Sequence, residues 1–143
     1  MISVLDTTAF SAAMRRETEM TEFLQSRRPG EVATVPPVVA EIEYGVQRIE
    51  PSSRKRALLE AERDRLLRAV RVLPWTDESS RQFGAAKAQL ERDGLPVDDI
   101  DIAIASIALS HDACVVTANL PHFSRINGVA CRHWAENAGR AGA

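Results

Sequence analysis

The chain places three carboxylates in the segment Val97-Asp-Asp-Ile-Asp101, directly before an uncharged apolar run over residues 102–109. The run predicts a helix that is apolar nearly all round, and such a helix is buried. A carboxylate beside apolar surroundings costs free energy unless it caps a helix, pairs with a cation or binds a metal. Asp98 suits the N-cap, and Asp101, which leads straight into the buried helix, is the favoured ligand. Asp99 fits either of two positions, one beside the site in support of it and one in solvent.

Two further polar side chains follow apolar runs that predict buried strands. Asp6 comes directly after the run at residues 2–5, and Asn119 lies shortly after the run at residues 113–116. In an open α/β sheet, ligands bind at the edge formed by the carboxyl ends of the strands. Asp6 and Asn119 are therefore expected at one edge, although Asp6 alone could also be a simple helix cap.

Glu41 and Glu43 lie in a helix predicted over residues 38–49, where a separation of two residues corresponds to about 200° around the axis. Only one of the two can therefore face a common site. Helix starts lie at the same edge of a parallel sheet as the carboxyl ends of strands, and Glu41 is nearer the start. We therefore place Glu41 at the site and Glu43 in solvent.

The expected site then combines four oxygen-bearing side chains, namely Asp6, Glu41, Asp101 and Asn119. Carboxylates in a shared cleft raise one another's pKa, and a divalent cation relieves that repulsion. Oxygen ligands without a thiolate suit Mg²⁺ or Mn²⁺, which can activate water and stabilise charge on a phosphoryl oxygen. The sequence has no Gly-rich phosphate loop, GxSxG elbow or HExxH motif, so the chemistries of those motifs lose support.

The elements that must position these residues alternate between strands and helices. This alternation predicts an α/β fold, with a central parallel sheet of four to five strands flanked by helices on both faces. A highly charged helical stretch over residues 54–70 suggests a peripheral helix or hairpin arm, whose leucines could serve a dimer, a partner helix or the core. We expect a single domain over residues 1–134 and a frayed tail over 135–143. The predicted strands cover residues 2–5, 32–35, 70–73, 113–116 and 129–131.

Composition limits the compartment and the partners. The 143 residues suit one domain with its own core, and no apolar run approaches the roughly 20 residues that span a bilayer. The N-terminus lacks the basic start of a signal peptide, and Cys114 and Cys131 are expected as buried free thiols, so a cytoplasmic location is expected. With a net charge of −2, any nucleic-acid contact must be local. The pair Arg15 and Arg16 is more simply explained as solvated surface.

Four segments carry a resemblance to a known family. In order, they are Leu5-Asp-Thr-Thr-Ala-Phe-Ser11, Ala40-Glu-Ile-Glu-Tyr-Gly45, Gly94-Leu-Pro-Val-Asp-Asp-Ile-Asp-Ile-Ala-Ile-Ala105 and Val116-Thr-Ala-Asn-Leu-Pro-His-Phe123. In this order and at this spacing the chain resembles the PIN-domain family, in particular the VapC-type toxins of bacterial type II toxin–antitoxin pairs. The resemblance implies a three-layer domain and an endoribonuclease that depends on Mg²⁺ or Mn²⁺. It also implies a cognate antitoxin that blocks the site.

The resemblance carries over to individual residues by position. Asp6, Glu41 and Asp101 fall on the acidic residues of the family. Asn119 stands where members carry Asp or Asn, and its neutral amide argues against a tightly held second metal. Thr8 stands where Asn is common, and its hydroxyl can still bond a neighbouring carboxylate.

The leading hypothesis is therefore metal-dependent hydrolysis of an RNA phosphodiester by a toxin that forms a homodimer. Asp6 and Asp101 would hold the ion. Glu41 would complete the cage or orient the attacking water, with Asn119 in support. The candidate phosphate contacts are Arg15, Arg16 and Arg125.

Two alternatives remain open at this point. A phosphatase-like domain would need a second Asp shortly after Asp6, and a receiver-like domain would need a lysine after Val116; the sequence has neither. A non-catalytic module, whose acidic cleft binds a basic segment of a partner, is the other alternative.

Overall fold

Five short parallel strands form the centre of the molecule in the computed structural model, which describes residues 1–137. The strands are β1 (Ser3–Leu5), β2 (Val32–Thr34), β3 (Arg71–Val72), β4 (Cys114–Val116) and β5 (Ala130–Arg132). Their order across the sheet is β3-β2-β1-β4-β5. All neighbouring pairs in this sheet are parallel, which confirms the predicted parallel sheet of four to five strands.

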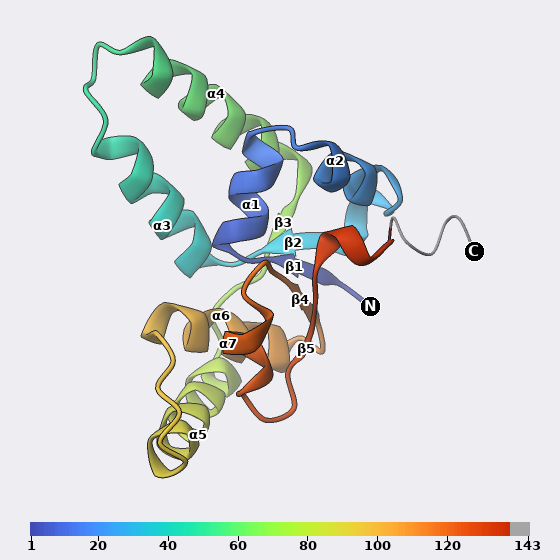
Figure 1. The fold of residues 1–143 in the computed structure, drawn as a ribbon, viewed down its shortest axis with the longest axis vertical. Helices are drawn as coiled ribbons and strands as arrows, with labels where there is room; N and C mark the ends of the chain where they lie inside the picture. The colour runs from blue at the N-terminus through green and yellow to red at the C-terminus, as the bar shows by residue number, and fades with distance from the viewer. Residues whose placement is uncertain (138–143) are drawn as a thin grey trace.

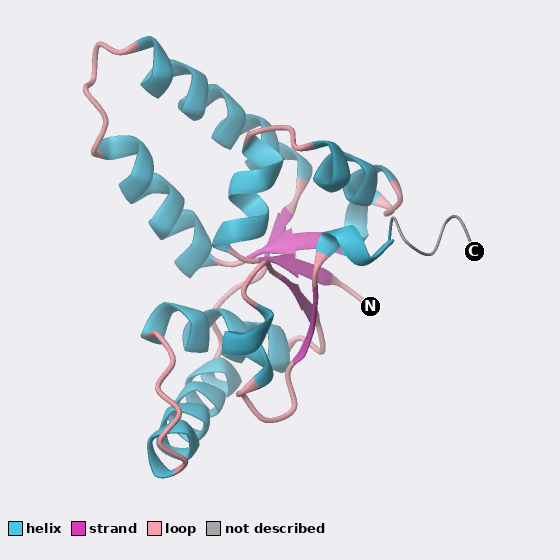
Figure 2. Cartoon of the chain, in the orientation of Figure 1, coloured by secondary structure: helices cyan, strands magenta, loops and turns pink. Residues whose placement is uncertain are grey.

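Helices cover both faces of this sheet. They are α1 (Thr7–Met14), α2 (Thr18–Gln25), α3 (Pro36–Gln47), α4 (Arg54–Ala69), α5 (Asp77–Arg92), α6 (Asp99–Ser110) and α7 (Leu120–Ser124), with short 3₁₀ turns η1 (Pro29–Glu31) and η2 (Trp134–Asn137). In Figure 1, α1 to α4 lie on one side of the strands and α5 and α6 lie on the other. The same layers are visible by secondary structure in Figure 2. The three-layer arrangement implied by the resemblance is thus confirmed.

The order in which the chain adds strands reverses between β1 and β4, which makes this the switch point of the sheet. From β1 it moves through β2 to β3 at one edge, and it then crosses back through α5 and α6 to β4 and β5. Leu5 pairs with Val116, so β1 and β4 end at the same level. Ligands bind outside the carboxyl ends of strands at such a switch point. The residues that follow β1 and β4, Asp6 and Thr117, therefore occupy the position where this fold class binds ligands.

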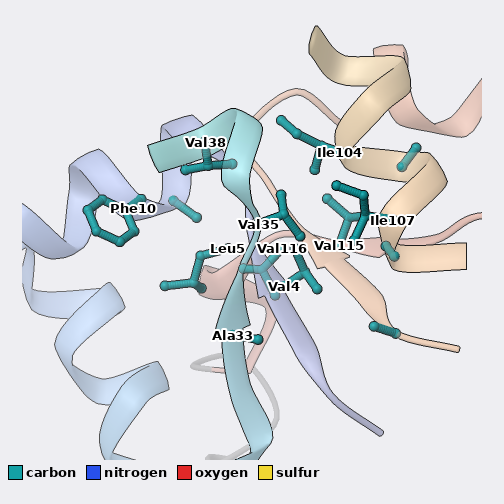
Figure 3. Packing of buried hydrophobic residues seen from close by; sticks show 14 of the residues in the cluster. Val4, Leu5, Phe10, Ala33, Val35, Val38, Ile104, Ile107, Val115 and Val116 are labelled. Atoms are coloured by element: carbon teal, nitrogen blue, oxygen red, sulfur yellow. The ribbon is translucent and has the colours of Figure 1, made fainter. Parts of the chain in front are cut away.

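The buried helix α6 packs its apolar surface directly against the sheet. Ile104 and Ile107 have no solvent exposure, and Figure 3 shows both near Val115 of β4. In the same view, Phe10 of α1 lies on the opposite side of the strands. Because strands that are covered on both faces must be buried on both faces, β1 and β2 are buried along their whole length rather than in alternation, whereas both residues of the edge strand β3 are exposed.

The helices α3 and α4 form an arm that extends away from the sheet (Figure 1). This confirms the hairpin arm suggested for the charged stretch over residues 54–70. Leu66 of the arm is buried in the core, whereas Leu58 is 62% exposed. The arm leucines therefore divide between the core and an open surface.

Short turns account for most differences from the predicted elements. The sequence pattern does not predict α7, η1 or η2, because one or two helical turns carry too little periodicity. η2 continues past the predicted domain boundary at residue 134 as far as Asn137, and the remainder of the predicted frayed tail, residues 138–143, lies outside the described residues. Cys114 and Cys131 are free thiols as expected, although they are half-buried rather than buried. Within residues 1–137 no helix is long and apolar enough to cross a membrane.

Candidate functional site

Asp6, which follows β1, is 1% exposed. Its Oδ1 accepts a hydrogen bond from the Thr8 hydroxyl at 2.6 Å and one from Ala9 N at 2.9 Å, so Asp6 is the N-cap of α1. Its Oδ2 accepts a hydrogen bond from the Thr117 hydroxyl at 2.6 Å. Burial raises the pKa of Asp6 above its usual value of 3.8, and these hydrogen bonds oppose the increase. Capping and a place in the site are therefore compatible roles of one carboxylate.

The two threonine hydroxyls that donate to Asp6 also connect the ends of β1 and β4. Ala118 N donates to Thr8 Oγ1 at 2.9 Å, and Asn119 N donates to Thr117 Oγ1 at 2.8 Å. The Thr8 hydroxyl thus bonds a neighbouring carboxylate, as expected for a hydroxyl at this position. Asn119 is half-buried and begins α7, so the segment after β4 brings it to the same edge as Asp6.

Asp101 lies in the first turn of α6, with 18% of its side chain exposed. His122 Nδ1 of α7 lies 3.3 Å from Asp101 Oδ2. Burial raises the pKa of Asp101, the contact with His122 lowers it, and the negative charges of Asp6 and Asp98 raise it further. The negative charge of Asp6 is thus one of the causes that raise the pKa of Asp101.

The other two carboxylates of the acidic segment have different partners. Asp98 accepts a hydrogen bond from Ile100 N at 2.8 Å and caps α6, as predicted. Asp99 pairs with Lys87 of α5 at 3.0 Å, and 62% of the Asp99 side chain is exposed. The sequence left two positions open for Asp99, one beside the site and one in solvent. The structure places the Asp99 side chain in solvent.

Glu41 and Glu43 diverge as helix geometry predicts. The Thr7 hydroxyl at the start of α1 donates a hydrogen bond to Glu41 Oε1. Glu43 accepts hydrogen bonds at 2.7 Å from Arg63 of α4 and from Gln47, and its side chain is 43% exposed. Glu41 therefore lies next to the residue that follows Asp6, whereas Glu43 stabilises the arm.

The three candidate phosphate contacts differ in their surroundings. Arg15 has a side chain that is 64% exposed and lies 3.7 Å from Glu17. Arg16 makes hydrogen bonds of 3.1–3.3 Å to Glu62 of α4, and Arg125 donates to the Pro96 carbonyl at 3.3 Å. Of the three arginines, Arg15 thus has the longest distance to its protein partner.

The residues at this edge fit a magnesium-like ion. Within residues 1–137, no three His, Cys, Asp or Glu side chains lie close enough together to form a closed metal cage. Mg²⁺ does not require one, because it usually binds through one or two carboxylates and keeps several waters. Asp6 and Asp101 supply two carboxylates whose pKa values are both raised by burial, and a bound cation would relieve that cost.

Three residues of this network were not identified from the sequence as site residues: Thr7, Thr117 and His122. Thr117 follows β4 directly and lies two residues before Asn119, so its place at the end of a strand was an available signal. Thr7 is adjacent to Asp6 in the same motif. His122 could not be found by periodicity, because the five-residue helix α7 that carries it is too short.

Comparison with known proteins identifies a family for this chain. Residues 3–129 match the PIN domain family. The chain is 29% identical over 97 residues to ribonuclease VapC2 of Rickettsia felis, which covers 68% of this chain and 69% of that protein. It is 34% identical over 94 residues to the tRNA(fMet)-specific endonuclease VapC of Salmonella typhimurium, which covers 66% of this chain and 68% of that protein.

Solved structures resemble the fold over nearly the whole chain. The structure of VapBC2 from Rickettsia felis, bound to a DNA fragment from its promoter, superposes with a TM-score of 0.83 at 25% identity and covers 94% of this chain and 99% of that one. DNA-bound VapBC from Salmonella typhimurium gives a TM-score of 0.84 at 24% identity, covering 94% and 98%. The second likeness, at this lower identity, supports the fold alone.

Proposed function

This chain belongs to the PIN-domain family, and on that premise we propose that it is a VapC-type toxin, an endoribonuclease that hydrolyses RNA phosphodiesters with Mg²⁺ or Mn²⁺. Support comes from relatives that are themselves named as ribonucleases and as a tRNA endonuclease. It also comes from the acidic residues at the switch point of the sheet. The observation that carries the proposal is the place of Asp6, whose carboxylate is 1% exposed at the switch point of the sheet where β1 and β4 end together.

In this proposal Asp6 and Asp101 hold the divalent ion. When bound, such an ion lowers the pKa of water and stabilises negative charge on the phosphoryl group. The hydroxyls of Thr8 and Thr117 fix both oxygens of Asp6, so the carboxylate is held in one orientation before any ligand arrives. The buried helix α6 fixes the backbone of Asp101, and His122 holds its Oδ2.

Glu41 orients or deprotonates the attacking water, and Thr7 positions the Glu41 carboxylate by donating a hydrogen bond to it. Asn119 contributes a neutral amide at the same edge, which suits a site built around one tightly held ion. Arg15 is the preferred phosphate contact. Arg16 and Arg125 are weaker candidates, since each already has a protein partner at 3.3 Å or less.

The test compares two substitutions in the same helical turn. Asp101→Asn removes a negative charge from the site, whereas Asp98→Asn keeps the capping oxygen of α6, because Asn and Asp cap helices about equally well. We expect Asp101→Asn to abolish cleavage of bulk bacterial tRNA in Mg²⁺, with an unchanged circular dichroism spectrum, and Asp98→Asn to cleave like the parent. Cleavage by Asp101→Asn at the parental rate would overturn the assignment.

The proposal includes a cognate antitoxin that binds this protein and blocks the acidic site, a homodimeric toxin and a cytoplasmic location. Solved structures with the same fold are named as VapBC, and one from Mycobacterium tuberculosis is named as a member of the VapBC family of toxin–antitoxin systems. Co-expression with a small open reading frame next to this gene should yield a stable complex in which tRNA cleavage is suppressed. Light scattering on the purified toxin measures whether it is a dimer.

A further inference from the structure

A hollow of about 540 Å³ lies between α1 and η2, directly beside the acidic site. Residues of α1 and of the segment entering η2 line it, and we call it the α1–η2 hollow; its lining includes Thr7, Thr8, Ser11, Arg15, His133 and Trp134. Thr7 and Thr8 donate hydrogen bonds to the site carboxylates Glu41 and Asp6. The hollow therefore shares a wall with the proposed catalytic site and continues away from it.

The α1 wall of the hollow is polar although α1 is mostly buried. Thr8, Ser11 and Arg15 are spaced three and four residues apart, which places them on one face of the helix. The other side of α1 includes Phe10 and Ala13, which are buried. At about 1.5 Å per residue, the distance along the axis from Thr8 to Arg15 is about 10 Å.

The opposite wall is a stacked pair of rings. The His133 and Trp134 rings have centroids 4.1 Å apart and an interplanar angle of 25°. Trp134 is 5% exposed, and its Nε1 donates to Glu17 Oε1 at 2.9 Å, so the pair is anchored from behind. His133 is only partly buried. Its Nδ1 accepts a hydrogen bond from Ala135 N at 3.0 Å, which leaves Nε2 to carry the proton of the neutral ring.

Arg15 and its neighbour Arg16 differ in their charged partners and in whether they line the hollow. Arg15 is 64% exposed and lies 3.7 Å from Glu17 Oε2, beyond ordinary hydrogen-bond distance. Glu17 has its other oxygen engaged by Trp134, which satisfies part of its hydrogen-bonding capacity. Arg16 does not line the hollow and is bonded to Glu62. Arg15 can therefore pair with an incoming phosphate, which suits a planar guanidinium well.

We infer that the α1–η2 hollow binds the single-stranded RNA next to the scissile phosphate, with one base stacked on the His133 ring and a flanking phosphate paired with Arg15. Proteins recognise unstacked RNA bases by stacking them on aromatic side chains and contacting the backbone with arginine. A ring already held against Trp134 needs little ordering to serve as such a platform. The inference rests on the proposed ribonuclease function, because it assigns this hollow to the substrate of that site.

The test combines kinetics with binding. Parent, Arg15→Ala, Arg81→Ala, His133→Ala and His133→Phe are compared for kcat and KM on bulk bacterial tRNA in Mg²⁺; Arg81 of α5 is the matched control, with 71% of its side chain exposed. The same proteins are titrated in EDTA with a short fluorescein-labelled RNA of mixed sequence at several salt concentrations. We expect His133→Ala to raise KM and Kd about tenfold through loss of one stacked base, with kcat close to the parental value, and His133→Phe to restore both.

Salt dependence separates the two contacts. Arg15→Ala should reduce the slope of log K against log salt by about 0.7, the value for one phosphate contact on a single strand. His133→Ala should leave that slope unchanged, and Arg81→Ala should behave like the parent. If Arg15→Ala and His133→Ala bind RNA like the parent, or if His133→Phe is as defective as His133→Ala, the inference is wrong. If the parent protein binds RNA with these dependences on Arg15 and His133 but cleaves none, the proposed function fails, and only the assignment of the hollow as an RNA-binding surface stands.

Discussion

The Thr117 hydroxyl donates a hydrogen bond of 2.6 Å to Asp6 Oδ2, although 111 residues separate the two positions in the chain. The contact exists because β1 and β4 are parallel neighbours whose last residues, Leu5 and Val116, pair in register. Thr117 has no solvent exposure, so its hydroxyl must find protein partners. It donates to Asp6 and accepts from Asn119 N. Thr117 thereby links a carboxylate of the site to the backbone that carries the fourth polar side chain.

Replacing Thr117 by the isosteric Val should weaken both stability and the site. The substitution leaves Asn119 N without its partner and removes a donor from an ionised carboxylate, which costs about 1–3 kcal/mol in unfolding free energy. It should also raise the pKa of Asp6 further, since that hydrogen bond lowers it. Urea denaturation and Mn²⁺ calorimetry measure the two effects. Thr21→Val, at an exposed position of α2, is the matched control; an equal loss there would show that the cost is not specific to the site.

Replacing Asp6 by Asn should stabilise the metal-free protein at neutral pH. The folded-state pKa of Asp6 is raised above 3.8, so folding is favoured by the protonated carboxyl, and this contribution is lost as the pH rises through the raised pKa. Asn cannot ionise and should raise the thermal midpoint in EDTA by a few degrees. The gain should shrink as the pH falls toward 3.8.

The same Asp6→Asn variant should no longer be stabilised by added Mn²⁺, whereas the parent should be, because a ligand that binds only the folded state raises its stability. Thermal scans in EDTA and in Mn²⁺, at neutral and acidic pH, measure both parts. A variant that is less stable than the parent in EDTA at neutral pH would contradict the view that burying this charge is costly.

Glu41 and Glu43 provide a paired test of helix geometry. Glu41→Gln should lower kcat for RNA cleavage by about 100-fold or more, the range expected when a positioned acid or base is lost. Glu43→Gln should keep the parental kcat and lose at most about 1 kcal/mol, since its ion pair with Arg63 is at the surface. Steady-state kinetics and urea denaturation of both variants measure these effects. Equal kinetic losses in the two variants would mean that neither glutamate is specific to the site.

His122 should set the pH range in which Asp101 accepts a metal ion. Contact with His122 lowers the pKa of Asp101, so His122→Ala should raise that pKa further. The acidic limit of Mn²⁺ binding should then move to higher pH, because a protonated carboxyl does not coordinate metal. Calorimetric titrations across the acidic range measure the limit. His111→Ala is the control, since the His111 ring contacts the Pro74 carbonyl instead; a shift of the limit in that variant as well would show a general electrostatic effect.

Local sequence patterns were sufficient for the strands and for the longer helices. The central strands β1, β2 and β4 appeared as mostly apolar runs because helices cover both faces of the sheet, and α6 appeared as an apolar helix because it is buried. Asp98 was identifiable as a cap because capping depends on neighbouring residues in the chain. Glu41 was separable from Glu43 because the angle between them follows from the helix itself.

Contacts between distant segments could not be read from such patterns. The short helix α7, which brings His122 to Asp101, lacks the length that makes periodicity visible. The two neighbouring arginines are equivalent in sequence, yet Arg16 reaches Glu62 on α4 while Arg15 lines the α1–η2 hollow. Where a long side chain finds its partner depends on how the helices pack, and sequence spacing alone does not contain that information.

The sequence by itself therefore determined that this protein is an α/β domain with oxygen-bearing side chains at the carboxyl edge of a parallel sheet. Only the tertiary structure decided how Asp6 is held, since Thr8 and Thr117 approach its two oxygens from α1 and from the end of β4. Burial and capping depend on residues that are close together in the chain, so both can be recognised in the sequence alone. The orientation of a buried carboxylate depends on hydrogen bonds across strands that meet only when the sheet forms.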